Sequence, residues 1–223
     1  MPTALTTPCL CLVTDSTLAP GELVERVANA VEGGVDLVQL REKTLLGGQL
    51  LDLATALLNA IGGRAKLIVN ERADVTLAAG ADGAQLGEEG LPVWAARKTL
   101  GDDYLIGRSV HSSSAALKAE SDGADFLLVG TMYSSRSHPG EQPAGPELMR
   151  KIARECHLPL IGIGGITPEN AAALIGAGAS GVAVITSIMA ASDPKAAAER
   201  LKEMIVTSWN SRGWSGNVGE EDD

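Results

Sequence analysis

Short apolar runs alternate along the chain with longer segments in which apolar residues recur at helical spacing. Most of the runs are continuously apolar, which is typical of parallel strands covered on both faces. The runs predict eight strands, at residues 9–15, 36–42, 66–71, 83–87, 104–110, 125–130, 158–165 and 181–187. The helical segments lie at residues 20–32, 47–61, 73–79, 92–99, 113–121, 145–154, 168–176 and 194–208.

Eight evenly spaced β/α units predict an α/β fold, a single (β/α)8 TIM barrel. An open doubly wound sheet also alternates strands and helices, but the even spacing favours closure. The predicted barrel covers residues 9–208, after an N-terminal extension at 1–8 and before a disordered acidic tail at 209–223. Gly-Ala-Asp before the fourth and sixth strands, and Gly-Ala-Ser before the eighth, indicate repetition of a structural unit.

Composition narrows the function classes. Aromatic residues make up 3% of the chain, so we expect an aliphatic core and no stacking surface for single-stranded nucleic acid. The net charge of −10 argues against a nucleic-acid partner, because neutralising phosphates requires clustered Lys and Arg. No apolar run reaches the roughly 18 residues that span a bilayer, and residues 1–8 lack the positive segment of a secretory signal.

The cysteines Cys9, Cys11 and Cys156 are odd in number and lack metal-binding spacing. Cys9 and Cys11 alternate on the first predicted strand, so their side chains should share one face. We expect these cysteines to be small buried residues in a reducing compartment. The sequence therefore predicts a cytoplasmic protein without a membrane partner.

Basic residues gather where the predicted strands end, and in a TIM barrel these carboxyl ends carry the active site. The basic residues at these ends or in the loops just after them are Arg41, Lys43, Arg72, Arg108 and Arg136. Local cations in an acidic protein indicate an anionic ligand.

The ends of the seventh and eighth strands carry the strongest phosphate signal. Gly164 and Gly165 end the seventh strand, and Ile185 and Thr186 end the eighth. Glycine lets backbone N–H groups approach a phosphate closely, and these two loops are the usual phosphate site of the fold. The alternative is that the glycine pair only makes a tight turn.

Gln39, Arg41 and Lys43 alternate along the end of the second strand, so their side chains can point together into the barrel mouth. Burying such groups is costly without a partner, and a second anionic group on the substrate would satisfy them. The alternative is a structural ion pair with Glu71 or Asp15.

Ser109 and His111 place a hydroxyl and an imidazole on one side of the fifth strand. Histidine titrates near neutrality, so His111 is the candidate general acid/base, with a purely structural hydrogen bond as the alternative. Glu71 ends the third strand and, with Glu88 or Glu89, could share a Mg²⁺ ion. Ordinary surface acids are the competing explanation.

Four stretches in order along the chain carry a resemblance to a known family. They are QLREK at 39–43, IVNER at 68–72, ADGAQLG at 81–87 and IGRSVH at 106–111. Together with 123–130, 162–167 and 178–187 they resemble the thiamine phosphate synthase/thiazole tautomerase (TenI) superfamily. The resemblance implies a TIM barrel that binds a small phosphorylated thiazole. A synthase joins hydroxymethylpyrimidine diphosphate to thiazole phosphate and releases pyrophosphate with the help of Mg²⁺; a tautomerase shifts a proton on thiazole carboxylate phosphate without a cofactor.

The resemblance also assigns roles to residues. It implies that the 164–165 and 185–186 loops bind the thiazole phosphate and that Glu71 is the candidate metal ligand. The implied substrate-binding residues are Gln39, Arg41, Lys43, Asn70, Ser135, Ser137 and His138.

This sequence departs from the synthase pattern where the diphosphate would bind. The Asn-Asp pair of the synthases falls on Asn70 and Glu71, and their second Mg²⁺ carboxylate falls on Gly90. Their Thr-x-Thr-Lys loop falls on residues 135–138, and a histidine of the fourth strand is Gln85. Losing an Asp ligand removes a charge and an oxygen that a hard cation needs.

The stretch around Ser109 and His111, by contrast, resembles the tautomerase closely. We therefore interpret the chain as a thiazole tautomerase-type isomerase, in which His111 moves the proton and Ser109 supports its orientation. The alternative is a Mg²⁺-dependent synthase, and the second alternative is a non-catalytic binder of thiazole or thiamine phosphates. A homo-oligomer is left open.

Overall fold

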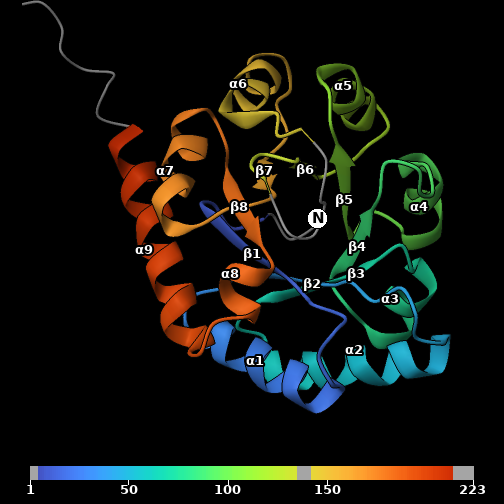
Figure 1. The fold of residues 1–223 in the computed structure, drawn as a ribbon. Coiled ribbons are helices and arrows are strands. Elements are labelled where there is room, and N and C mark those ends of the chain that lie inside the picture. Colours follow the sequence, from blue (N-terminus) through green and yellow to red (C-terminus); the bar gives the residue numbers. More distant parts are fainter. Residues whose placement is uncertain (1–4, 135–141, 213–223) are drawn as a thin grey trace, which may run out of the picture.

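The computed structural model describes residues 5–134 and 142–212, and its parallel strands close into a barrel in chain order (Figure 1). The strands are β1 (Cys9–Val13), β2 (Leu37–Leu40), β3 (Lys66–Asn70), β4 (Gly83–Leu86), β5 (Leu105–Val110), β6 (Phe126–Val129), β7 (Leu160–Ile163) and β8 (Gly181–Val184). The helices are α1 (Pro20–Glu32), α2 (Gly47–Ile61), α3 (Ala73–Ala79), α4 (Val93–Leu100), α5 (Ser113–Ser121), α6 (Gly145–Glu155), α7 (Pro168–Gly176), α8 (Thr186–Met189) and α9 (Pro194–Arg212). The predicted (β/α)8 TIM barrel is confirmed. Within the described ranges, no helix is both long and apolar enough to cross a membrane.

Several element ends differ from the prediction. The ladders of β1, β2 and β8 stop two to three residues before the predicted strands do, and apart from Thr14 the residues beyond them are partly buried or exposed at the barrel mouth. After β8 the chain turns at once into the short helix α8, so Thr186 begins a helix instead of ending a strand. Helix α9 continues to Arg212, which makes 209–212 helical and shortens the predicted tail. The rest of that tail, 213–223, lies outside the described residues.

Strand side chains alternate between an outer core under the helices and an inner core around the barrel axis. On β1, Leu10 and Leu12 belong to the outer core. The inner core consists of Cys9, Cys11, Val13, Leu37, Ile68, Leu105, Phe126, Leu128, Ile161 and Ala183. Leu5, from the N-terminal extension, packs against this inner core. As the composition predicts, both cores are largely aliphatic.

A repeated hydrogen bond joins the start of each even-numbered strand to the odd-numbered strand before it. In three cases an Asp carboxylate accepts a backbone N–H, and in the fourth a Ser hydroxyl does so. The pairs are Asp36 with Leu10 (2.7 Å), Asp82 with Leu67 (2.8 Å), Asp125 with Ile106 (2.7 Å) and Ser180 with Leu160 (3.4 Å). The three carboxylates also pair with Lys202 (2.7 Å), Lys66 (3.6 Å) and Arg97 (2.6 Å), respectively. The repeated Gly-Ala-Asp is therefore structural.

The three cysteines are free and buried. Burial raises the pKa of the Cys9 and Cys11 thiols well above the usual range, and it also raises the pKa of Cys156. A raised pKa in the folded state leaves less thiolate at pH 8 than the unfolded chain holds, and the thiolate is the reactive form. We expect a disulfide-exchange reagent at pH 8 to label no cysteine of the native protein and all of them in denaturant. Labelling that precedes unfolding would contradict this expectation.

Candidate active site

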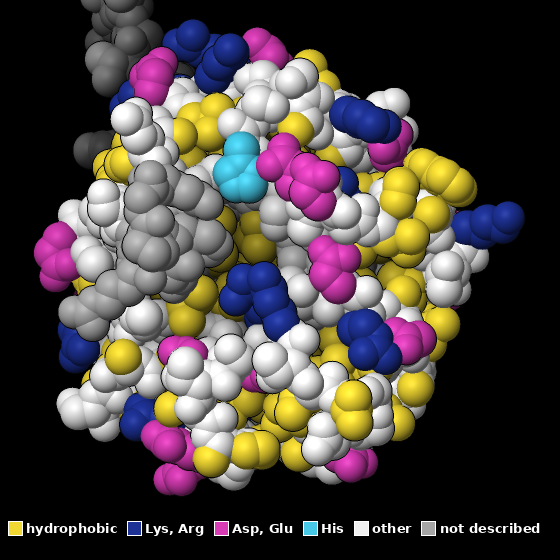
Figure 2. Space-filling model, turned by 45° about the vertical axis from the view of Figure 1, so that its right-hand side comes forward, with side chains coloured by type: hydrophobic (Ala, Val, Ile, Leu, Met, Phe, Trp, Pro, Cys, Tyr) yellow, Lys and Arg dark blue, Asp and Glu magenta, His cyan; other side chains and the backbone are white. Residues whose placement is uncertain are grey.

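A cavity of about 310 Å³ opens at the carboxyl ends of the strands. Its apolar floor is formed by side chains of Val13, Leu128, Ile163 and Ile185. Figure 2 shows a hollow with hydrophobic side chains in its depth and a histidine, acidic and basic side chains around it. The size and the mixed lining suit a small polar molecule.

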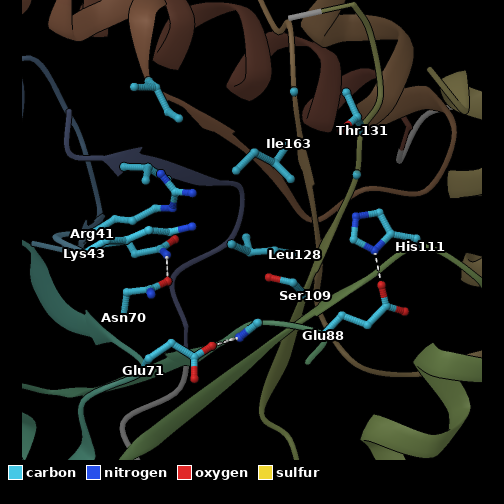
Figure 3. Close-up of a pocket in the computed structure, with 16 residues that line it drawn as sticks. Arg41, Lys43, Asn70, Glu71, Glu88, Ser109, His111, Leu128, Thr131 and Ile163 are labelled. Atoms are coloured by element: carbon cyan, nitrogen blue, oxygen red, sulfur yellow. Dashed lines mark hydrogen bonds and ion pairs between the residues drawn. The ribbon is translucent and has the colours of Figure 1, made fainter. Parts of the chain in front are cut away.

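The cavity brings together most of the residues that the sequence singles out. They are Gln39, Arg41, Lys43, Asn70, Glu71, Ser109, His111, Gly164 and Ile185 (Figure 3). Gly165 and Thr186 directly follow two of them in the chain. Ser135, Ser137 and His138 lie outside the described residues, as does Arg136.

Among the described residues, Arg41 and Lys43 are the basic side chains that line this cavity. Among the described residues neither side chain forms an ion pair, so the alternative of a structural bridge to Glu71 or Asp15 is not realised. Both side chains point into the same space (Figure 3). Arg41 does act on its neighbour Glu42: burial and Asp15 raise the pKa of that carboxyl, and Arg41 opposes them. The uncompensated positive charge at the mouth suits an anionic ligand.

Two other cations expected at the mouth have structural partners. The Arg72 guanidinium pairs with Asp74 at 2.7 Å, and this pairing raises the pKa of Arg72 and lowers that of the carboxyl. The Arg108 guanidinium donates to the carbonyl oxygens of Glu88 (2.6 Å) and Leu91 (2.9 Å). Arg108 therefore fastens the loop between β4 and α4 to β5, a role that the sequence did not predict.

Two amide side chains organise the polar wall. Gln39 Nε2 donates to Asn70 Oδ1 at 2.9 Å, and Gln85 Nε2 donates to Ser109 Oγ at 3.1 Å. Gln39 and Gln85 are 3% and 1% exposed, and the amide oxygen of each is buried without a partner among the described residues. A buried acceptor without a partner is costly to the fold, so these two amides are strained points of the polar wall.

His111 pairs with Glu88 across the mouth, with 2.5 Å between Nδ1 and Oε2 (Figure 3). The two side chains are half exposed, at 50% and 42%. The sequence placed both residues at the mouth but gave no sign that they touch, since 23 positions separate them. The contact holds the imidazole through Nδ1 and leaves Nε2 for the cavity.

Glu71 follows β3 in a left-handed backbone conformation, with φ of 62°. Such a conformation is uncommon for a residue other than glycine, and residues that adopt it cluster at functional sites. Its Oε1 accepts a hydrogen bond from the backbone N–H of Gly87, in the β4–α4 loop. The carboxylate is thereby held at the cavity edge against that loop.

The glycine pair after β7 is required by packing. Gly164 and Gly165 have φ of 104° and 62°, and a side chain on either would collide with residues 131–134. That segment pairs with them through Tyr133 N–H and the Gly164 carbonyl, at 3.0 Å. Ser187 Oγ donates to the Ile166 carbonyl at 2.5 Å and joins the two loops. The two glycines are therefore needed for the turn itself, and Gly164 lines the cavity beside Ile163 and Ile185; binding of a phosphate by this loop stays a prediction.

A divalent cation is implied by the resemblance, and Glu71 is the carboxylate best placed for it. Within residues 5–134 and 142–212, no cluster of three or more His, Cys, Asp or Glu side chains could hold a metal ion by itself. Mg²⁺ in phosphate sites, however, takes one or two carboxylates and fills its other positions with substrate phosphates and water. Glu71 fits such a shared site, whereas a cage made only of protein ligands is not present in the described part of the chain.

The fold and this cationic cavity define a TIM barrel suited to a small anionic ligand. The chain belongs to the thiamine monophosphate synthase family, whose pattern it matches over residues 10–188. It is 42% identical to a thiamine-phosphate synthase of Chlorobium luteolum over 92% of this chain and 97% of the relative. A thiamine-phosphate synthase of Natronomonas pharaonis is also 42% identical, over 87% and 93%. The solved thiamine phosphate pyrophosphorylase of Pyrococcus furiosus superposes with a TM-score of 0.82, at 34% identity, over 90% of this chain and 96% of that structure.

These relatives overturn the tautomerase interpretation. Curated proteins about 42% identical over most of the chain are synthases, which are transferases and not isomerases. The interpretation gave too much weight to Gly90 as a lost metal ligand. In the structure the Glu71 carboxylate lies against Gly90, so the space there is not empty.

Proposed function

We propose that this protein is a thiamine-phosphate synthase, which joins hydroxymethylpyrimidine diphosphate to thiazole phosphate and releases pyrophosphate. The observation that carries the proposal is the pair of cations Arg41 and Lys43, which form no ion pair with any described residue, beside the Glu71 carboxylate in one cavity. The identity to synthases over most of the chain supports it. The substrates are small molecules, and we propose neither a nucleic acid nor a membrane as a partner.

The diphosphate is assigned to the side of the cavity formed by β2 and β3. Arg41 and Lys43 supply positive charge to the phosphate oxygens, and Arg can bind them in a bidentate manner. Glu71 would hold Mg²⁺ together with the diphosphate, and the ion would neutralise charge on the leaving group. Ser135, Ser137 and His138 stay predicted contacts of this group.

The pyrimidine is assigned to Gln39, Asn70 and Ser109. The side chain of Gln39 lines the cavity, and its amide is the proposed hydrogen-bonding partner of the pyrimidine ring. Gln39 in turn orients Asn70, and Gln85 orients Ser109. The ring itself lies over the apolar floor.

The thiazole phosphate is assigned to the loops after β7 and β8. Gly164 and Ile185 line the cavity there, and Gly165 and Thr186 directly follow them in the chain. Backbone N–H groups bind phosphate oxygens without needing a charged side chain. The two substrates then meet over the floor between Leu128 and Ile163.

In the reaction, the thiazole nitrogen forms a bond to the methylene carbon of the pyrimidine. The bond from that carbon to the diphosphate oxygen breaks, and its electron pair leaves with pyrophosphate. Arg41 and Lys43 stabilise the charge that accumulates on the leaving oxygen, and the apolar floor limits access of water to the carbon. His111, held by Glu88, faces the reacting groups from the other side of the mouth.

The direct test mixes the protein with both substrates and Mg²⁺ and follows thiamine phosphate by chromatography. We expect product, and we expect a chelator to lower its rate by at least about a hundredfold, restored by added Mg²⁺. Product formed equally fast with chelator would contradict the role of the metal. Bound thiazole phosphate without any product would contradict the synthase and favour the non-catalytic binder. The cytoplasmic location and any homo-oligomer stay predictions.

A further inference from the structure

The carboxylate of Glu71 occupies the place that a side chain at position 90 would need. A Cβ atom built on Gly90 would overlap both carboxylate oxygens and lie 2.7 Å from Cδ of Glu71. A Cβ on Gly87 would come within 2.8 Å of Oε1. The Glu71 side chain therefore packs against the β4–α4 loop at Gly87 and Gly90, two positions that carry no side chain.

The loop is fastened in this position from two sides. Gly90 N–H donates to the Gly87 carbonyl at 3.0 Å, which closes a tight turn around the carboxylate. Arg108, on β5, holds the carbonyls of Glu88 and Leu91 on either side of Gly90. Since the loop is held, a side chain at 90 would have to displace the end of Glu71 and not the backbone.

Gly90 does not have a positive φ, so the backbone at 90 accepts other residues. The requirement for glycine comes from Glu71 alone. The end of Glu71 is flexible, and it can swing away at little cost to the fold. A side chain at 90 would therefore leave the protein folded and move the carboxylate.

We propose that Gly90 is a positioning residue: by having no side chain, it lets the Glu71 carboxylate occupy the place from which it holds a divalent cation together with a diphosphate. The proposal rests on the proposed function for the identity of that anion. It gives Gly90 a role opposite to the one expected from the sequence, where this residue counts as a missing ligand. Glu71 and Gly90 then form one unit, and changing either alters what the other does.

If Glu71 and Gly90 form one unit, the effect of a substitution at 90 should depend on the residue at 71. Gly90→Ala moves the carboxylate of Glu71. In a Glu71→Asp background the acid is one methylene shorter and does not reach Gly90, so the same alanine has nothing to displace. Strong coupling between two contacting sites is the signature of a shared space. Gly48→Ala is the matched control, because Gly48 lies in α2 with nothing within 4 Å of a new Cβ.

The experiment measures the affinity for inorganic pyrophosphate by calorimetry, with and without Mn²⁺ as the probe cation and without other substrates. In the natural sequence we expect Mn²⁺ to strengthen pyrophosphate binding at least about tenfold. Gly90→Ala and Glu71→Gln should each lower the pyrophosphate affinity measured with Mn²⁺ by at least about tenfold, which removes most of the gain. Thermal unfolding should show that both variants are folded. In the Glu71→Asp background, Gly90→Ala should change the gain by less than about twofold.

The opposite results would overturn the inference. One such result is that Mn²⁺ strengthens pyrophosphate binding as much in Gly90→Ala as in the Gly48→Ala control. Another is that Gly90→Ala lowers this gain equally with Glu71 and with Asp at position 71. The third is that Mn²⁺ does not strengthen pyrophosphate binding by the natural sequence. Failure of the synthase proposal is read separately, from the absence of thiamine phosphate when both substrates are supplied. If the two substitutions are coupled but the protein forms no thiamine phosphate, the inference about Glu71 and Gly90 stands and the proposed reaction is wrong.

Discussion

Replacing Arg41 with methionine is expected to lower kcat/KM for the pyrimidine diphosphate by about 10²–10³-fold. The side chain lines the cavity without an ion-pair partner among the described residues, so its charge is available to the leaving group. Methionine keeps most of the apolar stem and removes the charge. Steady-state kinetics at saturating thiazole phosphate would measure the change.

The control for this substitution is Arg150→Met. Arg150 pairs with Glu147 on the surface of α6 at 2.9 Å, and exposed pairs of this kind contribute little. We expect its kinetics to match the natural protein, and we expect both variants to unfold at the same temperature as that protein. An Arg41→Met enzyme with full activity would remove Arg41 from the diphosphate site.

Replacing Asp125 with alanine is expected to lower the free energy of unfolding by about 3 kcal/mol. The carboxylate accepts the Ile106 N–H at 2.7 Å and pairs with Arg97 at 2.6 Å, so its loss leaves a backbone donor and a guanidinium without that acceptor. Both charged side chains are about one-fifth exposed, at 19% for Arg97 and 22% for Asp125. Urea denaturation followed by circular dichroism would measure the loss.

Two further variants decide whether the hydrogen bond or the charge matters at this position. Asp125→Asn keeps an oxygen for the Ile106 N–H and should recover part of the stability. Glu147→Ala removes a carboxylate that is 77% exposed and should change the free energy of unfolding by less than about 0.5 kcal/mol. An Asp125→Ala protein as stable as Glu147→Ala would mean that the repeated strand-start bond contributes nothing.

The sequence predicted the barrel because continuous apolar runs and helical periods are local signals. It misjudged the carboxyl ends of the strands because strand pairing is not a local signal: residues such as Arg41 and Thr186 directly follow the apolar runs, but they leave the ladder for the loops at the barrel mouth. Helix α8 was missed because four residues give too short a period to detect.

The site was predicted as a set of residues but not as a set of contacts. Arg41 and Lys43 could be placed at the mouth by alternation along one strand. Three contacts depend on how separate loops meet above the barrel, which no local pattern encodes. They are the Glu88–His111 pair, the hydrogen bonds by which Arg108 fastens the β4–α4 loop, and the approach of Glu71 to Gly90. The error about the reaction arose there, since a glycine in place of an acid was taken as a loss.

The overlap between Glu71 and any side chain at position 90 restricts the order in which this pair of residues can be acquired. A lineage with an acid at 90 and a short acid at 71 would have to lose the side chain at 90 first. Lengthening residue 71 first would drive two carboxylates into one space. Losing the side chain at 90 first leaves that place without a carboxylate for one step, because a short acid at 71 does not reach it, but this order avoids the overlap, so the history of this site runs in that direction more easily than in the other.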